Sequence, residues 1–257
     1  MKMKQNIILW LGAIVITFLS GYVESVTSSD YPITGTIGVD GKKLSYKLDK
    51  AATPEEGLDI ILRTDVDSVT GQLEYKVVNS NSDWIKNPLE VSYKTLKINL
   101  HIEKDVKQLK YRVRIFTKDR DILIQEKNQP VLLNVKGKVP GMVNTFFYLF
   151  LFGGLLFSTR TALDYFNEKE KIKKLSLLTF ILFCSSVIIF FPLKKIYEMQ
   201  SLGSKIIPIA GLVDTPLLII TVVWLAATIL VFNIKNYKII PMIAAIITLI
   251  LFQINNL

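Results

Sequence analysis

Four long apolar runs occupy the second half of the chain, and each run is continuous. They cover residues 139–158, 175–193, 216–233 and 239–254, and the first holds no charged residue over its 20 positions. About 20 apolar residues are enough for a helix to cross the hydrocarbon core of a bilayer. A membrane-spanning barrel strand would instead alternate apolar and polar residues. The pattern therefore predicts a four-helix transmembrane bundle over residues 139–257.

Residues 30–138 follow a period of two. In residues 109–115, apolar side chains alternate with Lys110, Arg112 and Arg114, as in a strand with one buried face. Short runs of this kind are separated by Asn, Asp, Gly and Pro, and Asp40-Gly41 between two of them is a strong hairpin signal. We predict an extracytoplasmic, immunoglobulin-like β-sandwich, and hence an α+β membrane protein. The Lys and Arg residues form either a binding stripe or, as we favour, a solvated sheet face.

The N-terminus has the features of an export signal. Lys2 and Lys4 precede an apolar run over residues 7–19, and small and polar residues follow it. This is the pattern of a signal peptide, and cleavage after Ser25 would remove residues 1–25. The alternative is an uncleaved anchor helix that extends to about Val23. The run is short for a span of ~20 residues, which slightly favours cleavage.

Basic residues between the apolar runs predict the orientation. The net charge is +9, and residues 30–138 hold 19 basic and 16 acidic residues. Nine basic residues fall on the side that we assign to the cytoplasm: Lys2, Lys4, Arg160, Lys169, Lys171, Lys173, Lys174, Lys235 and Lys238. Three fall on the opposite side: Lys194, Lys195 and Lys205. The positive-inside rule then predicts a multi-pass protein of the inner (cytoplasmic) membrane, with the β domain and the C-terminus extracytoplasmic.

The composition argues against several classes of function. The excess charge lies largely between apolar runs, so it does not indicate the basic folded surface of a nucleic-acid-binding protein. Cys184 and His101 are single residues of their kinds, so neither a disulfide nor a Cys/His metal cluster is expected. We find no phosphate-binding Gly-rich loop and no nucleophile with a base. We therefore expect no catalytic residue, no cofactor and no metal ion.

Three stretches occur in order along the chain: YPITGTIGVDGKKLSYKL, GQLEYKVVNSNSDW with the later LKYRVRI, and VKGKVPGMVNTFFYLFLFGGLLFSTRTAL. They resemble an uncharacterised family of bacterial inner-membrane proteins found often in the Bacteroidetes. The resemblance implies an exported β domain followed by transmembrane helices, and no activity. Family members tend to carry a polar residue, often His, at the position where this chain has Phe147. They also tend to carry an Asp-rich segment before the next-to-last span, and this chain keeps only residues 213–215 of that segment. The resemblance therefore implies no proton, metal or haem site here.

Three candidate positions are acidic or basic residues at helix ends. Arg160 and Asp164 lie four residues apart at the inner end of the first span after the β domain, where they could pair. Their role is either a gate or docking pair or, as we favour, an anchor at the membrane interface. Asp214 precedes Pro216, and we expect it to cap the next helix rather than to form a site.

Three further candidates are an aromatic residue and two glycines. Trp84 follows Asp83 in a polar segment. It could bind a sugar or a partner, although such a Trp more often closes the core of a sandwich. Gly153 and Gly154 lie in the middle of a predicted span, where small residues let another helix approach closely.

Taken together, these features favour a non-catalytic multi-pass membrane protein. Its exported β domain would bind a partner or ligand, and its helices would anchor or assemble a complex. We expect contact with membrane lipid and with a protein partner or a second copy, and none with nucleic acid. The alternatives are a small transporter or transporter subunit and, second, a membrane-embedded enzyme. The scarcity of ionisable residues within the apolar runs counts against both alternatives.

Overall fold

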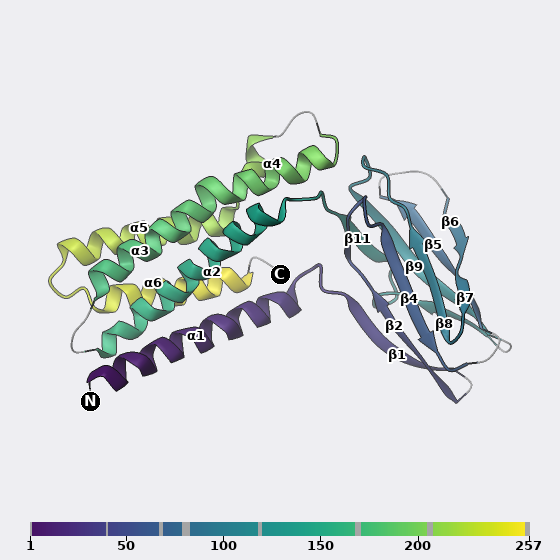
Figure 1. Ribbon diagram of the computed structural model, residues 1–257, viewed down its shortest axis with the longest axis horizontal. Coiled ribbons are helices and arrows are strands. Elements are labelled where there is room, and N and C mark those ends of the chain that lie inside the picture. The colour runs from purple at the N-terminus through teal and green to yellow at the C-terminus, as the bar shows by residue number, and fades with distance from the viewer. Residues whose placement is uncertain are drawn as a thin grey trace. The chain divides into compact units, whose positions relative to one another are not determined.

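The structure is a computed structural model of the 257-residue chain. It describes residues 2–39, 41–66, 69–78, 83–117, 120–167, 171–204 and 208–254. An N-terminal helix is followed by two β-sheets and then by several apolar helices, so the chain has α+β structure (Figure 1). It forms two compact units: a helical unit of Met1–Ser28, Val139–Met199 and Lys205–Leu257, and a β unit of Ser29–Lys138 with Gln200–Ser204.

The β unit contains two sheets. The first has the strand order β1-β2-β4-β8-β7, and the second has the order β3-β11-β9-β5-β6, with β10 paired to β9. The strands of the first sheet are β1 (Ile33–Val39), β2 (Lys42–Leu48), β4 (Leu58–Thr64), β8 (Thr95–Leu100) and β7 (Glu90–Ser92). Those of the second are β3 (Ala51–Ala52), β11 (Val131–Val135), β9 (Gln108–Phe116), β5 (Thr70–Val77), β6 (Ile85–Pro88) and β10 (Asp121–Ile124). The alternating pattern predicted all of these strands except β3 and β6.

The first hairpin forms at the expected place. Val39 pairs with Lys42, so that a two-residue connection joins β1 to β2. Gly41 has a φ of +75°, a left-handed conformation that glycine adopts without steric cost. Asp40, the other half of the predicted turn, lies outside the described residues.

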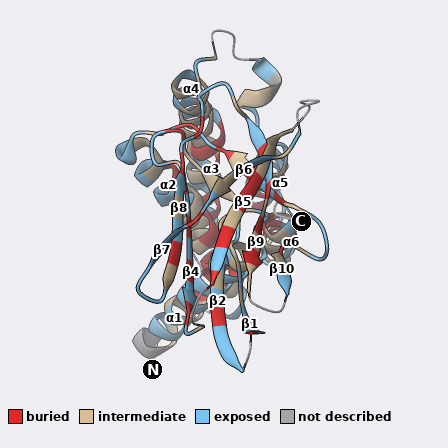
Figure 2. Ribbon diagram, turned by 90° about the vertical axis from the view of Figure 1, so that its right-hand side faces the viewer, coloured by how far each residue is buried: buried red, intermediate tan, exposed pale blue. Residues whose placement is uncertain are grey.

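Strand alternation builds one hydrophobic core from the buried faces of both sheets (Figure 2). Along β4 the residues alternate strictly between buried and exposed, and on β9 the expected apolar residues of 109–115 are buried. Tyr111 is fully buried, and its hydroxyl donates to the carbonyl oxygen of Asp49 at 2.7 Å. Burial, with smaller contributions from Asp49 and Glu126, raises the pKa of Tyr111, so the phenol stays neutral and keeps this bond.

The helical unit is built from apolar helices. They are α1 (Lys2–Thr27), α2 (Gly141–Leu163), α3 (Ile172–Ser185), α4 (Phe191–Ser201), α5 (Thr215–Asn233) and α6 (Ile239–Ile254). Four segments of the described chain are long and apolar enough to cross a membrane: Gln5–Thr27, Gly141–Phe166, Ile172–Ser201 and Thr215–Asn233. Helix α6 is apolar but shorter. These lengths indicate a membrane protein.

One helical segment is longer than the apolar run predicted. Helix α3 continues through a π-helical segment, Ser186–Phe190, into α4. Lys194 and Lys195 therefore lie on a helix, and not in the loop that we expected. Pro192 is the second residue of α4, so that one residue, Phe191, separates it from the π-helical segment. Proline has no backbone N–H to donate, and a π-helical segment changes the backbone hydrogen-bonding pattern just before it. The helix can therefore continue through Pro192.

The helical unit has its own hydrophobic core. Phe147, Phe183 and Trp224 are among its buried residues. The Trp224 indole is fully enclosed, and its Nε1–H donates to Oγ1 of Thr248 at 2.9 Å. This bond links α5 to α6 and satisfies a polar group that lipid could not satisfy.

Candidate functional site

Helix α2 ends in a buried ion pair. Arg160 Nη1 donates to Oδ1 of Asp164 at 2.8 Å, and the two side chains are 2% and 0% exposed. Arg160 Nη2 donates to Oδ1 of Asn6 at 2.7 Å, and the guanidinium lies 5.4 Å from the centre of the Trp10 ring. The expected pair thus exists, but it is enclosed within the helical unit and does not offer an exposed anchor or docking group.

Asp164 also organises the connection from α2 to α3. Its Oδ1 accepts from Nδ2 of Asn167 at 2.8 Å, and its Oδ2 accepts from the backbone N–H of Lys171, the residue before α3. These two hydrogen bonds add to the one that the Asp164 carboxylate accepts from Arg160. Together with Arg160 it holds α1, the end of α2 and the start of α3 in one polar cluster, which we call the arginine cluster (Asn6, Trp10, Arg160, Asp164 and Asn167).

Helix α1 packs with the other helices along its length. Thr17 Oγ1 lies 3.2 Å from Oγ1 of Thr159 on α2, in a buried position. On α6, Gln253 Nε2 donates to both the carbonyl oxygen and Oγ of Ser20, each at 2.9 Å. Helix α1 therefore shares polar bonds with two helices in addition to the bond that it makes with Arg160.

The two adjacent glycines of α2 have different surroundings. A Cβ atom on Gly154 would lie 2.8 Å from the Phe183 ring of α3, whereas a Cβ on Gly153 would lie 3.7 Å from Leu182. The first distance is a clash and the second is an ordinary contact. Gly154 is therefore the position at which the absence of a side chain allows α3 to approach.

Asp214 has the role that the sequence predicted. Its Oδ1 accepts from the backbone N–H of Leu217 at 2.8 Å at the start of α5, and Pro216 lies in the first turn. This is the geometry of an N-cap, in which the carboxylate satisfies a backbone donor that has no partner within the helix.

A second ion cluster lies on the β unit, on the outward face of the second sheet. Glu74 of β5 is 1% exposed and accepts from Nε of Arg112 at 2.6 Å and from Nε of Arg114 at 2.9 Å, both on β9. Gln72 Nε2 donates to Glu74 at 2.7 Å. Burial alone would raise the pKa of Glu74, but the hydrogen bonds from Arg114, Arg112 and Gln72 outweigh it and lower the pKa to about 2.

Trp84 lies beside this cluster and outside the hydrophobic core. The Arg112 guanidinium is 4.5 Å from the centre of its ring and Lys76 Nζ is 5.3 Å from it. The expectation that Trp84 closes the core therefore differs from the structure. The reason is the alternation of side chains along a strand. Ile85 pairs with Tyr75 and shares its face, so Trp84, the residue before Ile85, lies on the opposite face with Lys76 and Glu74, away from the core.

Basic residues gather around Trp84 and Glu74. Residues paired across antiparallel strands share a face, and the register places Lys86 opposite Glu74, and Lys110 opposite Lys76. Strands β5, β6 and β9 together carry five basic residues and one acidic residue. We call this surface the cationic face; its members are Lys76, Lys86, Lys110, Arg112 and Arg114, with Trp84 and Glu74. Asp121 of β10 is near enough to Arg114 to act on its charge.

The other sheet distributes its charges differently. Lys47 pairs with Asp49 at 2.8 Å, and Lys97 pairs with Glu90 at 3.8 Å. On the cationic face, by contrast, Glu74 is shared by two arginines, and Lys76 lies directly opposite Lys110. Like charges directly opposite each other disfavour strand pairing. The second sheet therefore carries an electrostatic cost that its fold does not require.

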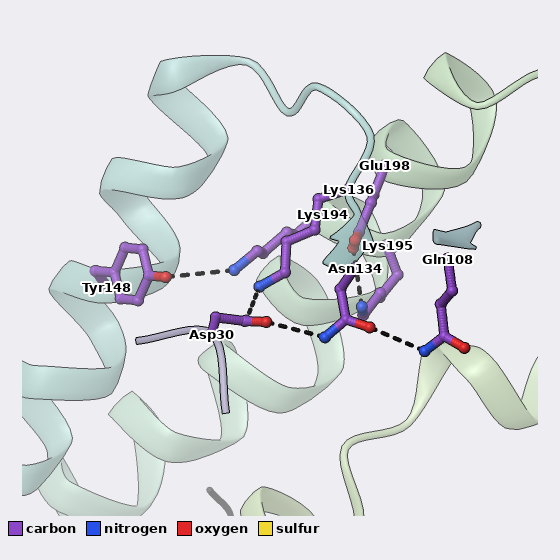
Figure 3. A network of polar contacts seen from close by, with 8 residues as sticks. All are labelled: Asp30, Gln108, Asn134, Lys136, Tyr148, Lys194, Lys195 and Glu198. Atoms are coloured by element: carbon purple, nitrogen blue, oxygen red, sulfur yellow. Dashed lines mark hydrogen bonds and ion pairs between the residues drawn. The ribbon is translucent and has the colours of Figure 1, made fainter. Parts of the chain in front are cut away.

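A polar network also joins the first residues of the β unit to its last strand. Asn134 Nδ2 donates to Oδ1 of Asp30 at 3.1 Å, and Asn134 Oδ1 accepts from Nε2 of Gln108 at 2.9 Å, while Lys136 pairs with Asp30 (Figure 3). These side chains satisfy one another. They hold the chain before β1 against β11 and β9.

The lysines on α4 also contact other side chains of the helical unit. Lys195 pairs with Glu198 at 2.8 Å, and Lys194 Nζ lies 3.5 Å from the hydroxyl of Tyr148 (Figure 3). Lys194 also lies 4.8 Å from the ring centre of Phe147 and 5.0 Å from that of Tyr148. Cations placed over aromatic rings in this way are stabilised by the ring electrons. We therefore assign these lysines to packing.

No cluster suited to metal binding is present in the described part of the chain, where no three His, Cys, Asp or Glu side chains come together. No protein-family model, curated protein or solved structure matches the chain. The arginine cluster and the cationic face are thus the two arrangements from which a function can be argued.

Asn6 and Glu74 complete these two clusters, and neither was predicted from the sequence. Gln72, Glu74 and Lys76 alternate with Leu73 and Tyr75 along one strand, so the outward position of Glu74 could have been predicted. Its two arginine partners depend on the pairing of β5 with β9. Asn6 is a polar residue at the start of an apolar run. Its partner Arg160 is 154 residues away along the chain, and no local pattern indicates that contact.

Proposed function

We propose that the protein is a non-catalytic, membrane-anchored binding protein. The β unit, which we assign to an immunoglobulin-like sandwich on the extracytoplasmic side, binds a partner through the cationic face. The helical unit anchors it in the inner membrane of a bacterium and assembles the complex. The observation that carries the proposal is the cationic face itself. Its five basic residues gather around a half-buried Trp84 and around Glu74, whose two carboxylate oxygens both accept hydrogen bonds from arginines.

The charge arrangement of this face supports binding over a purely structural role. Glu74 already accepts from both arginines, so it cannot neutralise Lys76 and Lys110 as well. Features that disfavour folding without a compensating contact are expected at functional sites. A partner with negative charge would remove the repulsion between the two lysines, and it would find the tryptophan already fixed by Arg112.

The arginine cluster supports an uncleaved N-terminal helix. Removal of residues 1–25 would take Asn6 and Trp10 away from Arg160, which is 2% exposed. An ionised side chain within a membrane unit is costly unless it is paired or hydrogen bonded. We therefore propose that α1 remains as a transmembrane helix, so that the N-terminus is cytoplasmic and the β unit is exported.

Thiol labelling tests this topology. In a Cys184→Ser background, a cysteine introduced by Lys43→Cys should react with a membrane-impermeant thiol reagent in intact spheroplasts. One introduced by Lys171→Cys should react only after lysis. Mass spectrometry of the purified protein should find α1 intact. Labelling of the Lys171→Cys variant in intact cells would overturn the orientation, and loss of the first 25 residues would overturn the role of α1.

Site-specific photo-crosslinking in living cells tests the binding function. A photoreactive amino acid at position 86 reports on the cationic face, and the same amino acid at position 43 reports on the other sheet as a matched control. We expect an adduct at position 86 and none at position 43. The proposal fails if position 86 gives no adduct, or if both positions give the same one.

A further inference from the structure

We infer that the partner of the cationic face is an acidic polysaccharide, a sugar chain that carries carboxylate groups, lying across strands β6, β5 and β9. This inference rests on the proposed function and names the chemical class of its ligand. It follows from three properties of the face: how its charges are spread, which donors its arginines still offer, and how little apolar surface surrounds Trp84.

The charges are spread over a flat array. Lys110, Arg112 and Arg114 occupy alternate positions along β9, Lys76 lies on the adjacent strand β5, and Lys86 lies on the strand after that, β6. Along a strand, side chains on one face recur about every 6.6–6.8 Å, and adjacent strands are about 4.8 Å apart. Such an array does not converge on one point, as a pocket for a small anion does. It suits a polymer that presents negative charges at regular intervals.

The arginines keep donors for such a chain. Each of Arg112 and Arg114 uses Nε to bind Glu74, and a guanidinium has four further N–H donors on its terminal nitrogens. The two side chains remain 24% and 31% exposed. Glu74 therefore fixes the two guanidinium groups in place and leaves them able to bind carboxylates, for which a planar fork of donors is well suited.

The composition of the face favours a sugar chain over an acidic protein. The centre of a protein–protein interface is rich in apolar residues, whereas the outward residues of β5 and β9 beside Trp84 are Gln72, Glu74 and the basic residues. An exposed apolar side chain of this face, Leu132, lies on β11, on the far side of Lys110 from β5. Trp84 is the one large aromatic side chain among the described residues of this cluster. A half-exposed indole next to hydrogen-bond donors offers an apolar surface to a sugar ring and polar contacts to its substituents.

Direct binding measurements test the ligand class. We would use the purified full-length protein in mild detergent with a fluorescently labelled oligogalacturonate as the probe. Binding should weaken as salt is added, because the contacts are partly exposed ion pairs. The triple variant Lys76→Gln/Lys86→Gln/Lys110→Gln should lose affinity by about tenfold, the sum of three such pairs. These lysines do not bind Glu74, so the fold should be retained.

A matched triple variant on the other sheet serves as the control. Lys43→Gln/Lys47→Gln/Lys97→Gln removes the same charge and should leave the affinity unchanged. Equal loss in both variants would show a non-specific charge effect and overturn the inference. So would binding of neutral dextran with the same affinity, or tighter binding of a polyglutamate peptide of equal charge or of phosphatidylglycerol vesicles. If position 86 crosslinks in cells while oligogalacturonate does not bind, the ligand class is wrong and the binding function stands.

Discussion

The two ion clusters of this protein use the same side chains for different purposes. In the helical unit, one arginine and one aspartate are matched, and Asn6, Asn167 and a backbone N–H make further hydrogen bonds to the pair. In the β unit, one glutamate serves two arginines that are each about a quarter to a third exposed. The comparison teaches that an enclosed, balanced pair holds helices together, whereas a half-open cluster with excess charge can also bind.

The largest effect should come from breaking the enclosed pair. Asp164→Ala leaves Arg160 buried with no carboxylate, and removing one partner of a buried ion pair costs about 3–5 kcal/mol. We expect a large fall in the thermal stability of the helical unit in mild detergent. The double variant Arg160→Leu/Asp164→Leu removes both charges and should recover much of the loss. A single variant as stable as the wild type would show that the pair does not hold the helices.

Removal of the shared carboxylate should have the next largest effect. Glu74→Gln leaves Arg112 and Arg114 adjacent without an acceptor of full charge, and we expect a loss of about 2–3 kcal/mol in the β unit near pH 7. Denaturant unfolding of the full-length protein, followed by tryptophan fluorescence, would measure it. The variant should retain its helical content, because the helices belong to the other compact unit.

The same carboxylate predicts a pH dependence. Because the folded state lowers the pKa of Glu74 from 4.5 to about 2, its stabilisation is complete above about pH 4.5 and is lost as the pH falls through about 2. The difference in unfolding free energy between wild type and Glu74→Gln should therefore be constant above pH 5 and should shrink below it. A difference that grows on acidification would contradict the assigned ion pairs.

The smallest effects should come from the outer members of the two clusters, Asn6, which is exposed, and Gln72, which is half-buried. Asn6→Leu removes the acceptor of Nη2 of the buried Arg160 and should cost about 1–2 kcal/mol. Gln72→Leu removes one donor from Glu74, but both arginine donors remain, so we expect a loss of less than about 1 kcal/mol. Thermal unfolding of both full-length variants would test this order. Equal losses would mean that the remaining arginine donors do not compensate for the loss of Gln72.

Local patterns in the sequence were sufficient for most of the fold. Strand alternation predicted the buried positions of β9, and the continuous apolar runs predicted α2, α3, α5 and α6, because side-chain periodicity directly reflects which face meets the core. The cap at Asp214 is also local. The continuation of α3 into α4 was not predicted, because the apolar run ends at Leu193 and two lysines follow it, whereas the helix continues past them to Ser201.

The sites were less accessible to prediction than the fold. Arg160 and Asp164 could be paired from their spacing, but their burial depends on α1, which is remote in the chain. Trp84 could be noticed as an aromatic residue in a polar segment. Its position on the outward face depends on the register between β5 and β6, and a slip by one residue would reverse it.

The bond between Gln253 and Ser20 has a consequence for biosynthesis. These residues are 233 positions apart, so the ribosome completes α1 long before it makes α6. If α1 is a transmembrane anchor, as we propose, the β unit would be exported and folded while α1 still lacks one of its packing partners. We therefore expect the helical unit to become stable only late in synthesis. Before that point α1 would be open to lateral exchange with the translocation machinery, insertases or quality-control proteases.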